Sequence, residues 1–217
     1  MAQAYPWNDL MWAEMGDLGL LLHELGDGDF DRPSLCAGWA VRDVVGHMLL
    51  GHTAPMVEML MLVGRYRGNI TRGSLEKSRE LAHSLAPTEL RSRWDDVVTK
   101  RTKRGIARVI RPVEAYIDHT VHHQDIRRAL DRPREIPAPR LLAALDGAVR
   151  VSSPMFSPKK RIKGLRLQAT DVDWAHGDGP VVRGAGEAIV MAAAGRPSAL
   201  ADLDGDGIAT LSARMGT

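Results

Sequence analysis

Apolar residues recur at helical spacing along the first two-thirds of the chain, with turn residues between the runs. The pattern predicts a first helix over residues 10–25, which ends at the Gly26-Asp-Gly-Asp29 turn. A second helix begins after Gly38, and Pro55 bends or ends it because proline lacks a backbone donor. Further along, we predict continued apolar character through Val63, a polar loop containing Gly68 and Gly73, and helices from Pro87 to about Lys103, from Pro112 to about Leu130 and from Arg140 to Val151.

The pattern changes after Ser153, where apolar and polar residues alternate instead of recurring at helical spacing. Residues 164–170 alternate as a half-buried strand does, and residues 181–183 predict a second, shorter strand. Residues 187–194 return to a helical pattern before an end rich in Gly and Asp. We therefore predict a mainly α protein with two domains. A helical bundle covers residues 1–153, and a small α+β C-terminal domain covers residues 154–217.

Composition and charge narrow the class of protein. The 217 residues are 44% hydrophobic and carry 29 basic and 27 acidic side chains, a net charge of +2. This balance argues against a dedicated nucleic-acid binder, and the basic strings at 100–104 and 159–163 lack interleaved aromatic residues, so we interpret them as solvated surface. The single cysteine, Cys36, excludes an internal disulfide. The apolar runs near the start are too short to span a bilayer, so we expect a cytoplasmic protein without membrane contacts, and the oligomeric state, a homodimer included, stays open.

One ten-residue segment, from Tyr116 to Asp125, holds three of the eight histidines and two aspartates. On a helix, Asp118 and His122 lie one turn apart on the same side. That spacing lets one helix offer two ligands to a metal such as zinc, because carboxylate and imidazole are both good zinc ligands. Asp125 lies one turn beyond His122 and could orient the His122 ring.

A competing register of the same helix joins His119 and His123, which are also one turn apart but rotated by about 100° from the first pair. Apolar residues are spread around this helix, so periodicity does not choose between the registers. A solvated polar face with incidental histidines is the third reading, and spacing alone leaves all three open.

A further ligand has to come from elsewhere in the chain, and His47 is the candidate. It lies at the edge of the apolar stripe of the second predicted helix, and Asp43, one turn earlier, could accept its ring N–H. A core-edge histidine bonded to that aspartate is the structural alternative. His52 lies nearer the middle of the stripe and stays a rival ligand. The remaining histidines have no partner spacing and are expected at the surface: His23, His83 and His176.

Two motifs add a family resemblance to this reading. The segment Ser34-Leu-Cys-Ala-Gly-Trp-Ala-Val-Arg-Asp-Val-Val-Gly-His47 resembles the N-terminal signature of the DinB-like, mycothiol-dependent maleylpyruvate isomerase family. Residues 121–128 resemble its second signature, in which an acidic residue precedes a ligand histidine by one helical turn. Residues 164–167, 171–174, 184–189 and 195–197 of the tail are similar too, so the resemblance covers nearly the whole chain.

The resemblance implies a DinB-like four-helix bundle with a divalent metal, usually zinc, held by His, Glu and His. On this chain the ligands would be His47, Asp118 and His122. Asp118 stands where glutamate is expected and is one methylene shorter, so coordination geometry or metal preference can differ. Histidine and carboxylate ligands also accept nickel or iron. Related bundles with three histidine ligands keep His119 and His123 as alternatives.

The implied chemistry follows from an open coordination position, which three protein ligands leave on a metal. A low-molecular-weight thiol bound there is deprotonated, and the metal-bound thiolate is a nucleophile at neutral pH. The resemblance identifies the thiol as mycothiol. If the thiolate adds to an electrophilic double bond, allows rotation about it and then leaves, the reaction is an isomerisation, whereas lasting attachment is an S-transfer. Cys36 is not needed and is expected to pack near the helix entrance. The alternative is a non-catalytic metal-binding protein with a sensing or stress-related role.

Overall fold

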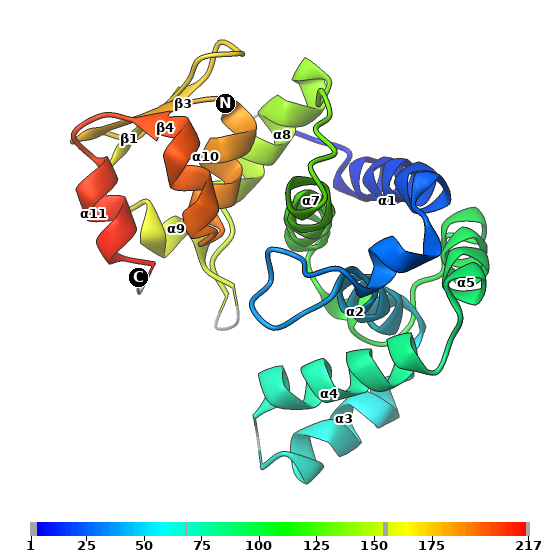
Figure 1. Ribbon diagram of the computed structural model, residues 1–217. Coiled ribbons are helices and arrows are strands. Elements are labelled where there is room, and N and C mark those ends of the chain that lie inside the picture. Colours follow the sequence, from blue (N-terminus) through cyan, green and yellow to red (C-terminus); the bar gives the residue numbers. More distant parts are fainter. Residues whose placement is uncertain (1–3, 68, 154–155, 216–217) are drawn as a thin grey trace.

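The computed structural model describes residues 4–67, 69–153 and 156–215, and a mainly helical part lies beside a smaller part that holds the sheet (Figure 1). The helical part contains α1 (Trp7–Glu24), α2 (Val41–Thr53), α3 (Met56–Arg65), α4 (Ile70–His83), α5 (Pro87–Thr99), α6 (Ile106–Val109), α7 (Pro112–Ala129) and α8 (Ala138–Ala148), with a 3-10 turn η1 (Asp27–Asp31) after α1. The mainly α fold with a small sheet in its C-terminal part is confirmed. Within the described residues, no helix has the length and apolar content that crossing a membrane requires.

The C-terminal part is a four-stranded sheet with short helices. Its strands are β1 (Arg166–Ala169), β2 (Ala175–His176), β3 (Val181–Gly184) and β4 (Leu203–Asp204), and its helices are α9 (Pro158–Arg161), α10 (Gly186–Ala193), η2 (Pro197–Asp202) and α11 (Ile208–Ala213). The strand order is β2-β1-β3-β4, with β1 parallel to β3 and the other two pairs antiparallel. Alternate residues of β1 are buried, as the sequence pattern predicted. Both predicted strands are confirmed.

The predicted polar loop containing Gly73 is wrong, because residues 70–83 form α4, while Gly68 lies outside the described residues. Asn69 caps this helix by accepting a hydrogen bond from the Arg72 backbone N–H at 3.0 Å. The helix packs closely on α2: a Cβ added at Gly46 would lie 2.7 Å from the Ser78 carbonyl oxygen. Close packing on α2 therefore stabilises a helix whose polar sequence gave little sign of it.

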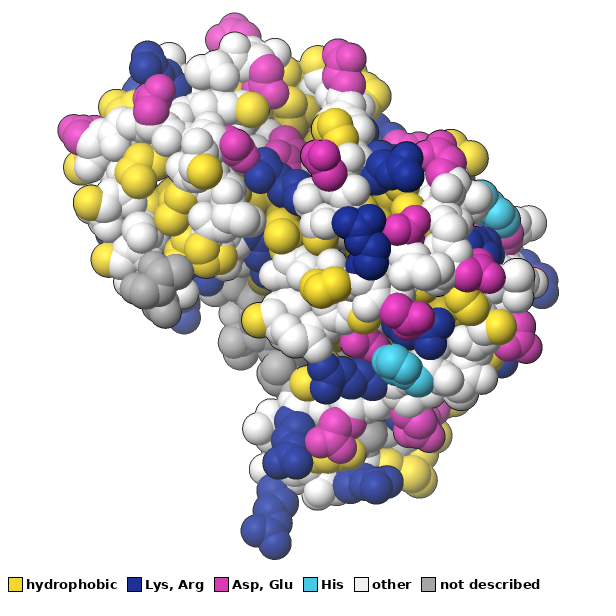
Figure 2. Space-filling view, viewed as in Figure 1, with side chains coloured by type: hydrophobic (Ala, Val, Ile, Leu, Met, Phe, Trp, Pro, Cys, Tyr) yellow, Lys and Arg dark blue, Asp and Glu magenta, His cyan; other side chains and the backbone are white. Residues whose placement is uncertain are grey.

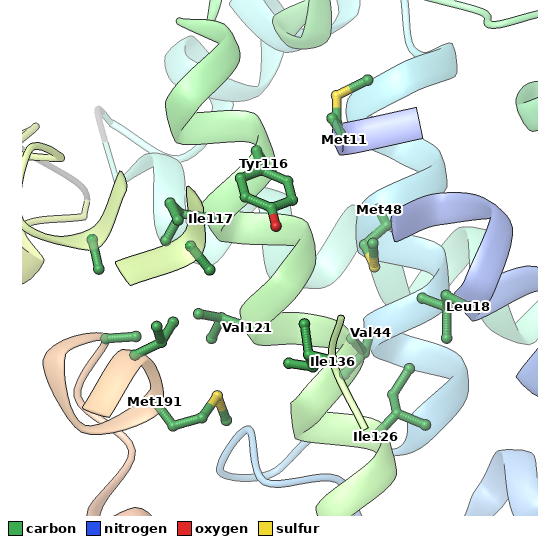
Figure 3. Packing of buried hydrophobic residues seen from close by; sticks show 14 of the residues in the cluster. Met11, Leu18, Val44, Met48, Tyr116, Ile117, Val121, Ile126, Ile136 and Met191 are labelled. Carbon is green, nitrogen blue, oxygen red and sulfur yellow. The ribbon is translucent and has the colours of Figure 1, made fainter. Parts of the chain in front are cut away.

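Helix α7 runs through the middle of the apolar core (Figure 3). Figure 3 labels Met11 and Leu18 of α1, Val44 and Met48 of α2, Tyr116, Ile117, Val121 and Ile126 of α7, Ile136, and Met191 of α10. These residues belong to one buried cluster, so the core continues from the helical part into the C-terminal part. On the face shown in Figure 2, basic and acidic side chains are intermixed on the right and at the bottom, and hydrophobic and uncharged surface dominates the left.

Candidate functional site

Three candidate ligands meet where α2 and α7 face each other. One donor atom from each of His47, Asp118 and His122 lies within 4.8 Å of the other two. His122 Nε2 is 3.6 Å from Asp118 Oδ1, and the rings of His47 and His122 meet edge to face with their centroids 5.2 Å apart. The rings of Trp39 and His47 also meet edge to face, with their centroids 5.4 Å apart. A carboxylate and two imidazoles therefore converge on one point, which is the donor set of a zinc site with an open position.

The charge states of these groups suit a cation. Burial lowers the pKa of His47 to about 4, helped by the nearby His122, so its imidazole is neutral near pH 7. Burial alone would raise the pKa of Asp118, but His122 and His119 hold it well below its usual range. Burial opposes charge on His122 as well, yet Asp118 and Asp125 outweigh it and raise its pKa to about 10. The two carboxylates thus favour a positive charge between them, which a divalent cation also supplies.

Asp125 contacts His122 as the sequence predicted, with Oδ2 3.0 Å from the ring Nδ1. Its carboxylate is fully buried and accepts two hydrogen bonds from Arg196, at 2.9 Å from Nε and 2.6 Å from Nη2. Arg196 precedes η2, so this bidentate pair connects the C-terminal part to a candidate ligand. Sequence reasoning missed Arg196, whose only signal was its place in the Gly195-Arg-Pro motif of the family resemblance.

Cys36 lies in the loop before α2, near the start of that helix as expected, but it also contacts the candidate site. Its Sγ lies 3.1 Å from Asp125 Oδ2 and 3.7 Å from both His122 Nδ1 and Arg196 Nη2. The loop that carries it is held against α7 by a hydrogen bond from the Leu35 N–H to the Asp125 carbonyl at 3.1 Å. Cys36, His122 and Asp125 also form a second cluster of possible metal donors. Arg196 already neutralises Asp125, so this second cluster is the poorer cation site.

The predicted hydrogen bond between Asp43 and His47 is absent. Asp43 Oδ2 instead accepts from the Ala40 N–H at 2.9 Å, which caps α2, and its Oδ1 lies 3.0 Å from His83 Nε2. His47 Nδ1 faces Ser74 Oγ of α4 at 3.4 Å. The capping position of Asp43 explains the difference, because it directs the carboxylate to the start of α2 rather than to the next turn. His83 therefore has a partner, although its side chain is exposed as expected.

The rival histidines have other main partners, although His119 Nδ1 also lies 3.4 Å from Asp118 Oδ2. His52 Nε2 and His119 Nε2 lie 2.8 Å apart, and His52 Nδ1 is 2.8 Å from the Thr102 carbonyl oxygen. His123 Nδ1 is 2.7 Å from Glu14 Oε1. All three histidines are buried, and none of them joins a group of three metal donors among the described residues. The geometry therefore favours the register of Asp118 and His122 over that of His119 and His123.

Comparisons with known proteins relate the chain to one family and one fold. The family model described as the mycothiol maleylpyruvate isomerase N-terminal domain matches residues 11–127, a range that includes all three candidate ligands. A crystal structure of the mycothiol-dependent maleylpyruvate isomerase is similar in fold, with a TM-score of 0.56 and 17% identity. A crystal structure of a histidine-to-alanine mutant of that isomerase is similar too, with a TM-score of 0.60 and 16% sequence identity. Each alignment covers 92% of this chain and 91% of the other.

No curated protein matches the sequence. Since the family model spans more than half of its length, the chain belongs to the mycothiol maleylpyruvate isomerase N-terminal domain family.

Proposed function

We propose that this protein is a metal- and thiol-dependent enzyme, an isomerase or S-transferase that acts on a small electrophilic substrate. Mycothiol is the proposed thiol and zinc the proposed metal, held by His47, Asp118 and His122. The observation that carries the proposal is the convergence of these three donors within 4.8 Å in a chain of this family. The similar solved structures are of a mycothiol-dependent maleylpyruvate isomerase, which supports the choice of thiol and of reaction class.

Each residue has a defined part in the proposed mechanism. When bound, the metal lowers the pKa of a coordinated thiol and so supplies a nucleophile at neutral pH. The neutral His47 offers a lone pair, and Asp118 offers a carboxylate that stays ionised. Asp125 orients the His122 ring through Nδ1, which leaves Nε2 on the side of Asp118. Trp39 packs against the His47 ring and helps to fix its position.

The proposal is tested by measuring metal content and thiol chemistry on the purified protein. We expect a stoichiometric divalent metal, and consumption of mycothiol that depends on an electrophile and stops after chelation. The electrophile panel includes maleylpyruvate because the similar solved structures are of a maleylpyruvate isomerase. Bound metal without thiol consumption across the panel would favour the alternative, a non-catalytic metal-binding protein. A protein that neither retains nor binds a metal would contradict both readings.

Replacing Arg196 with glutamine is expected to weaken metal binding by about 10–100-fold, the usual cost of losing a group that orients a metal ligand. The change removes the charge of Arg196 and its bidentate pairing with Asp125, which orients His122. Competition with a zinc chelator measures the affinity. Arg183→Gln is the matched control, because Arg183 forms an exposed pair with Asp204 elsewhere in the C-terminal part. Equal zinc affinity in the two variants would show that Arg196 does not support the site.

A further inference from the structure

Ser74 of α4 is the polar neighbour of the candidate ligand His47, and the proposed mechanism gives it no part. Its Oγ lies 3.4 Å from His47 Nδ1, and among the described residues the His47 ring has no other hydrogen-bond partner. A ligand histidine usually donates its second ring N–H to a carboxylate, a carbonyl or water. Asp43, the partner that spacing suggested, instead binds the backbone at the start of α2. Ser74 therefore stands where that carboxylate was expected.

Close packing of α4 on α2 brings this hydroxyl to the ring. Gly46, next to His47, has no side chain, and a Cβ there would lie 2.7 Å from the Ser78 carbonyl oxygen. Ser78 is fully buried and lies one turn beyond Ser74, so the two serines share the face of α4 that contacts α2. The backbone of α4 is thus held against α2 at the point from which Ser74 reaches His47.

The Ser74 hydroxyl has no competing partner. A serine within a helix often turns its hydroxyl back to the carbonyl oxygen four residues earlier. Ser78 does so, because its hydroxyl donates to the Ser74 carbonyl oxygen at 2.6 Å. Among the described residues, His47 is the only hydrogen-bond partner of the Ser74 hydroxyl. A hydroxyl both donates and accepts, so it can take the Nδ1–H of a neutral imidazole without adding a charge.

The direction of this hydrogen bond decides which ring nitrogen can bind a metal. If Ser74 Oγ accepts from Nδ1–H, the lone pair of His47 lies on Nε2. If the hydroxyl donates to Nδ1 instead, Nε2 carries the proton and is not a ligand. Within the part of the chain that the structure describes, Nε2 has no hydrogen-bond partner, as a donor atom for a metal requires.

We propose that Ser74 is a positioning residue for His47: its hydroxyl accepts the Nδ1–H and so presents Nε2 to the metal. The inference rests on the proposed function for the presence of a metal, but the tautomer of His47 can be measured without one. Helix α4, which the sequence did not predict, then has a defined part in the site. At 3.4 Å the hydrogen bond is long, so its effect belongs at the lower end of the range for groups that support a metal ligand.

Zinc affinity, measured by competition with a chelator, is the first test. Ser74→Ala should weaken zinc binding about tenfold, because the His47 ring loses the group that selects its tautomer. Ser84→Ala is the matched control, since the hydroxyl of this exposed serine at the end of α4 bonds to the Leu81 carbonyl oxygen. It should bind zinc as the wild type does. Equal affinity in Ser74→Ala and Ser84→Ala would overturn the proposal.

The tautomer of His47 in the metal-free protein is the second test, with the chemical shifts of the ring nitrogens as the NMR readout. In the wild type we expect the proton on Nδ1 and the lone pair on Nε2. Ser74→Ala should lose this preference, whereas Ser74→Thr, which keeps a hydroxyl, should retain it. A proton on Nε2 in the wild type would contradict the role of Ser74. The Nδ1–H tautomer in a wild type that binds no zinc would support the orientation of the ring by Ser74 and contradict the proposed function.

Discussion

His122→Ala is expected to lower zinc affinity by more than about 100-fold and to abolish thiol-dependent turnover, with the fold retained. Loss of a ligand should exceed the 10–100-fold cost of losing a group that only supports one. His122 also separates two carboxylates, at 3.6 Å from Asp118 and 3.0 Å from Asp125. Its removal leaves these like charges facing a smaller side chain. Zinc content after dialysis and mycothiol consumption are the two measurements.

Three variants make this result specific. His47→Ala should lose zinc to a similar extent, because the proposed site needs a donor from α2 as well as two from α7. His176→Ala, which changes an exposed histidine of β2, should keep the affinity of the wild type. His123→Ala tests the competing register, and it should leave zinc affinity in place even if it reduces stability. Zinc retained in His122→Ala but lost in His123→Ala would reverse the assignment of the ligands.

The half of the site that lies on one helix could be predicted from spacing. Residues three or four apart on a helix share a face, so the positions of Asp118, His122 and Asp125 follow once the segment is helical. His47 was chosen over His52 from the family resemblance, since both lie along the apolar stripe of one helix. Geometry supplies the reason for that choice: His52 faces His119 and the Thr102 carbonyl oxygen instead.

The rest of the site depends on contacts between distant segments, which spacing does not reveal. Cys36 and Arg196 reach Asp125 from a loop before α2 and from the C-terminal part, and neither has a periodic relation to α7. Asp43 shows a different limit. Its position in the sequence allowed either a contact with His47 or a cap at the start of α2. In the structure, the Asp43 carboxylate accepts a hydrogen bond from the backbone N–H of Ala40 and caps the helix.

The fold was predictable where an apolar period is clear. Helices α1 and α2 and strands β1 and β3 each carry such a pattern, and each is present near its predicted position. Helix α7 was predicted instead from Pro112 at its start and from Asp131-Arg-Pro133 after its end. Helix α4 was missed because its sequence is mostly polar and contains Gly73, whose low helix propensity favoured the prediction of a loop. Its packing against Gly46 of α2 is a tertiary effect.

Glu14→Gln is expected to destabilise the protein by about 3–5 kcal/mol, the cost of breaking a buried ion pair by removing one partner. Glu14 is 1% exposed and accepts hydrogen bonds from His123, Arg134 and Arg140. Glutamine keeps the shape but not the charge, so the partly buried guanidinium groups of Arg134 and Arg140 lose their shared carboxylate and keep only their pairs with Asp17. Urea unfolding measures the loss. Asp9→Asn, which removes an exposed pair with Arg101, should cost no more than about 1 kcal/mol.

Acid pH gives this prediction a second, independent readout. Burial alone would raise the pKa of Glu14, but His123 and Arg134 outweigh it and hold the pKa well below its usual range. A carboxyl group of this kind stabilises the fold above its unfolded pKa, about 4.3, and the contribution is lost as pH falls towards the folded value. Unfolding free energies of the wild type and of Glu14→Gln should therefore converge as pH drops below about 4. A constant difference between them down to pH 2 would mean that packing, and not charge, makes Glu14 important. Convergence would show that the charge of Glu14 holds α1 against the side of α7 that carries His123, next to the turn that presents His122.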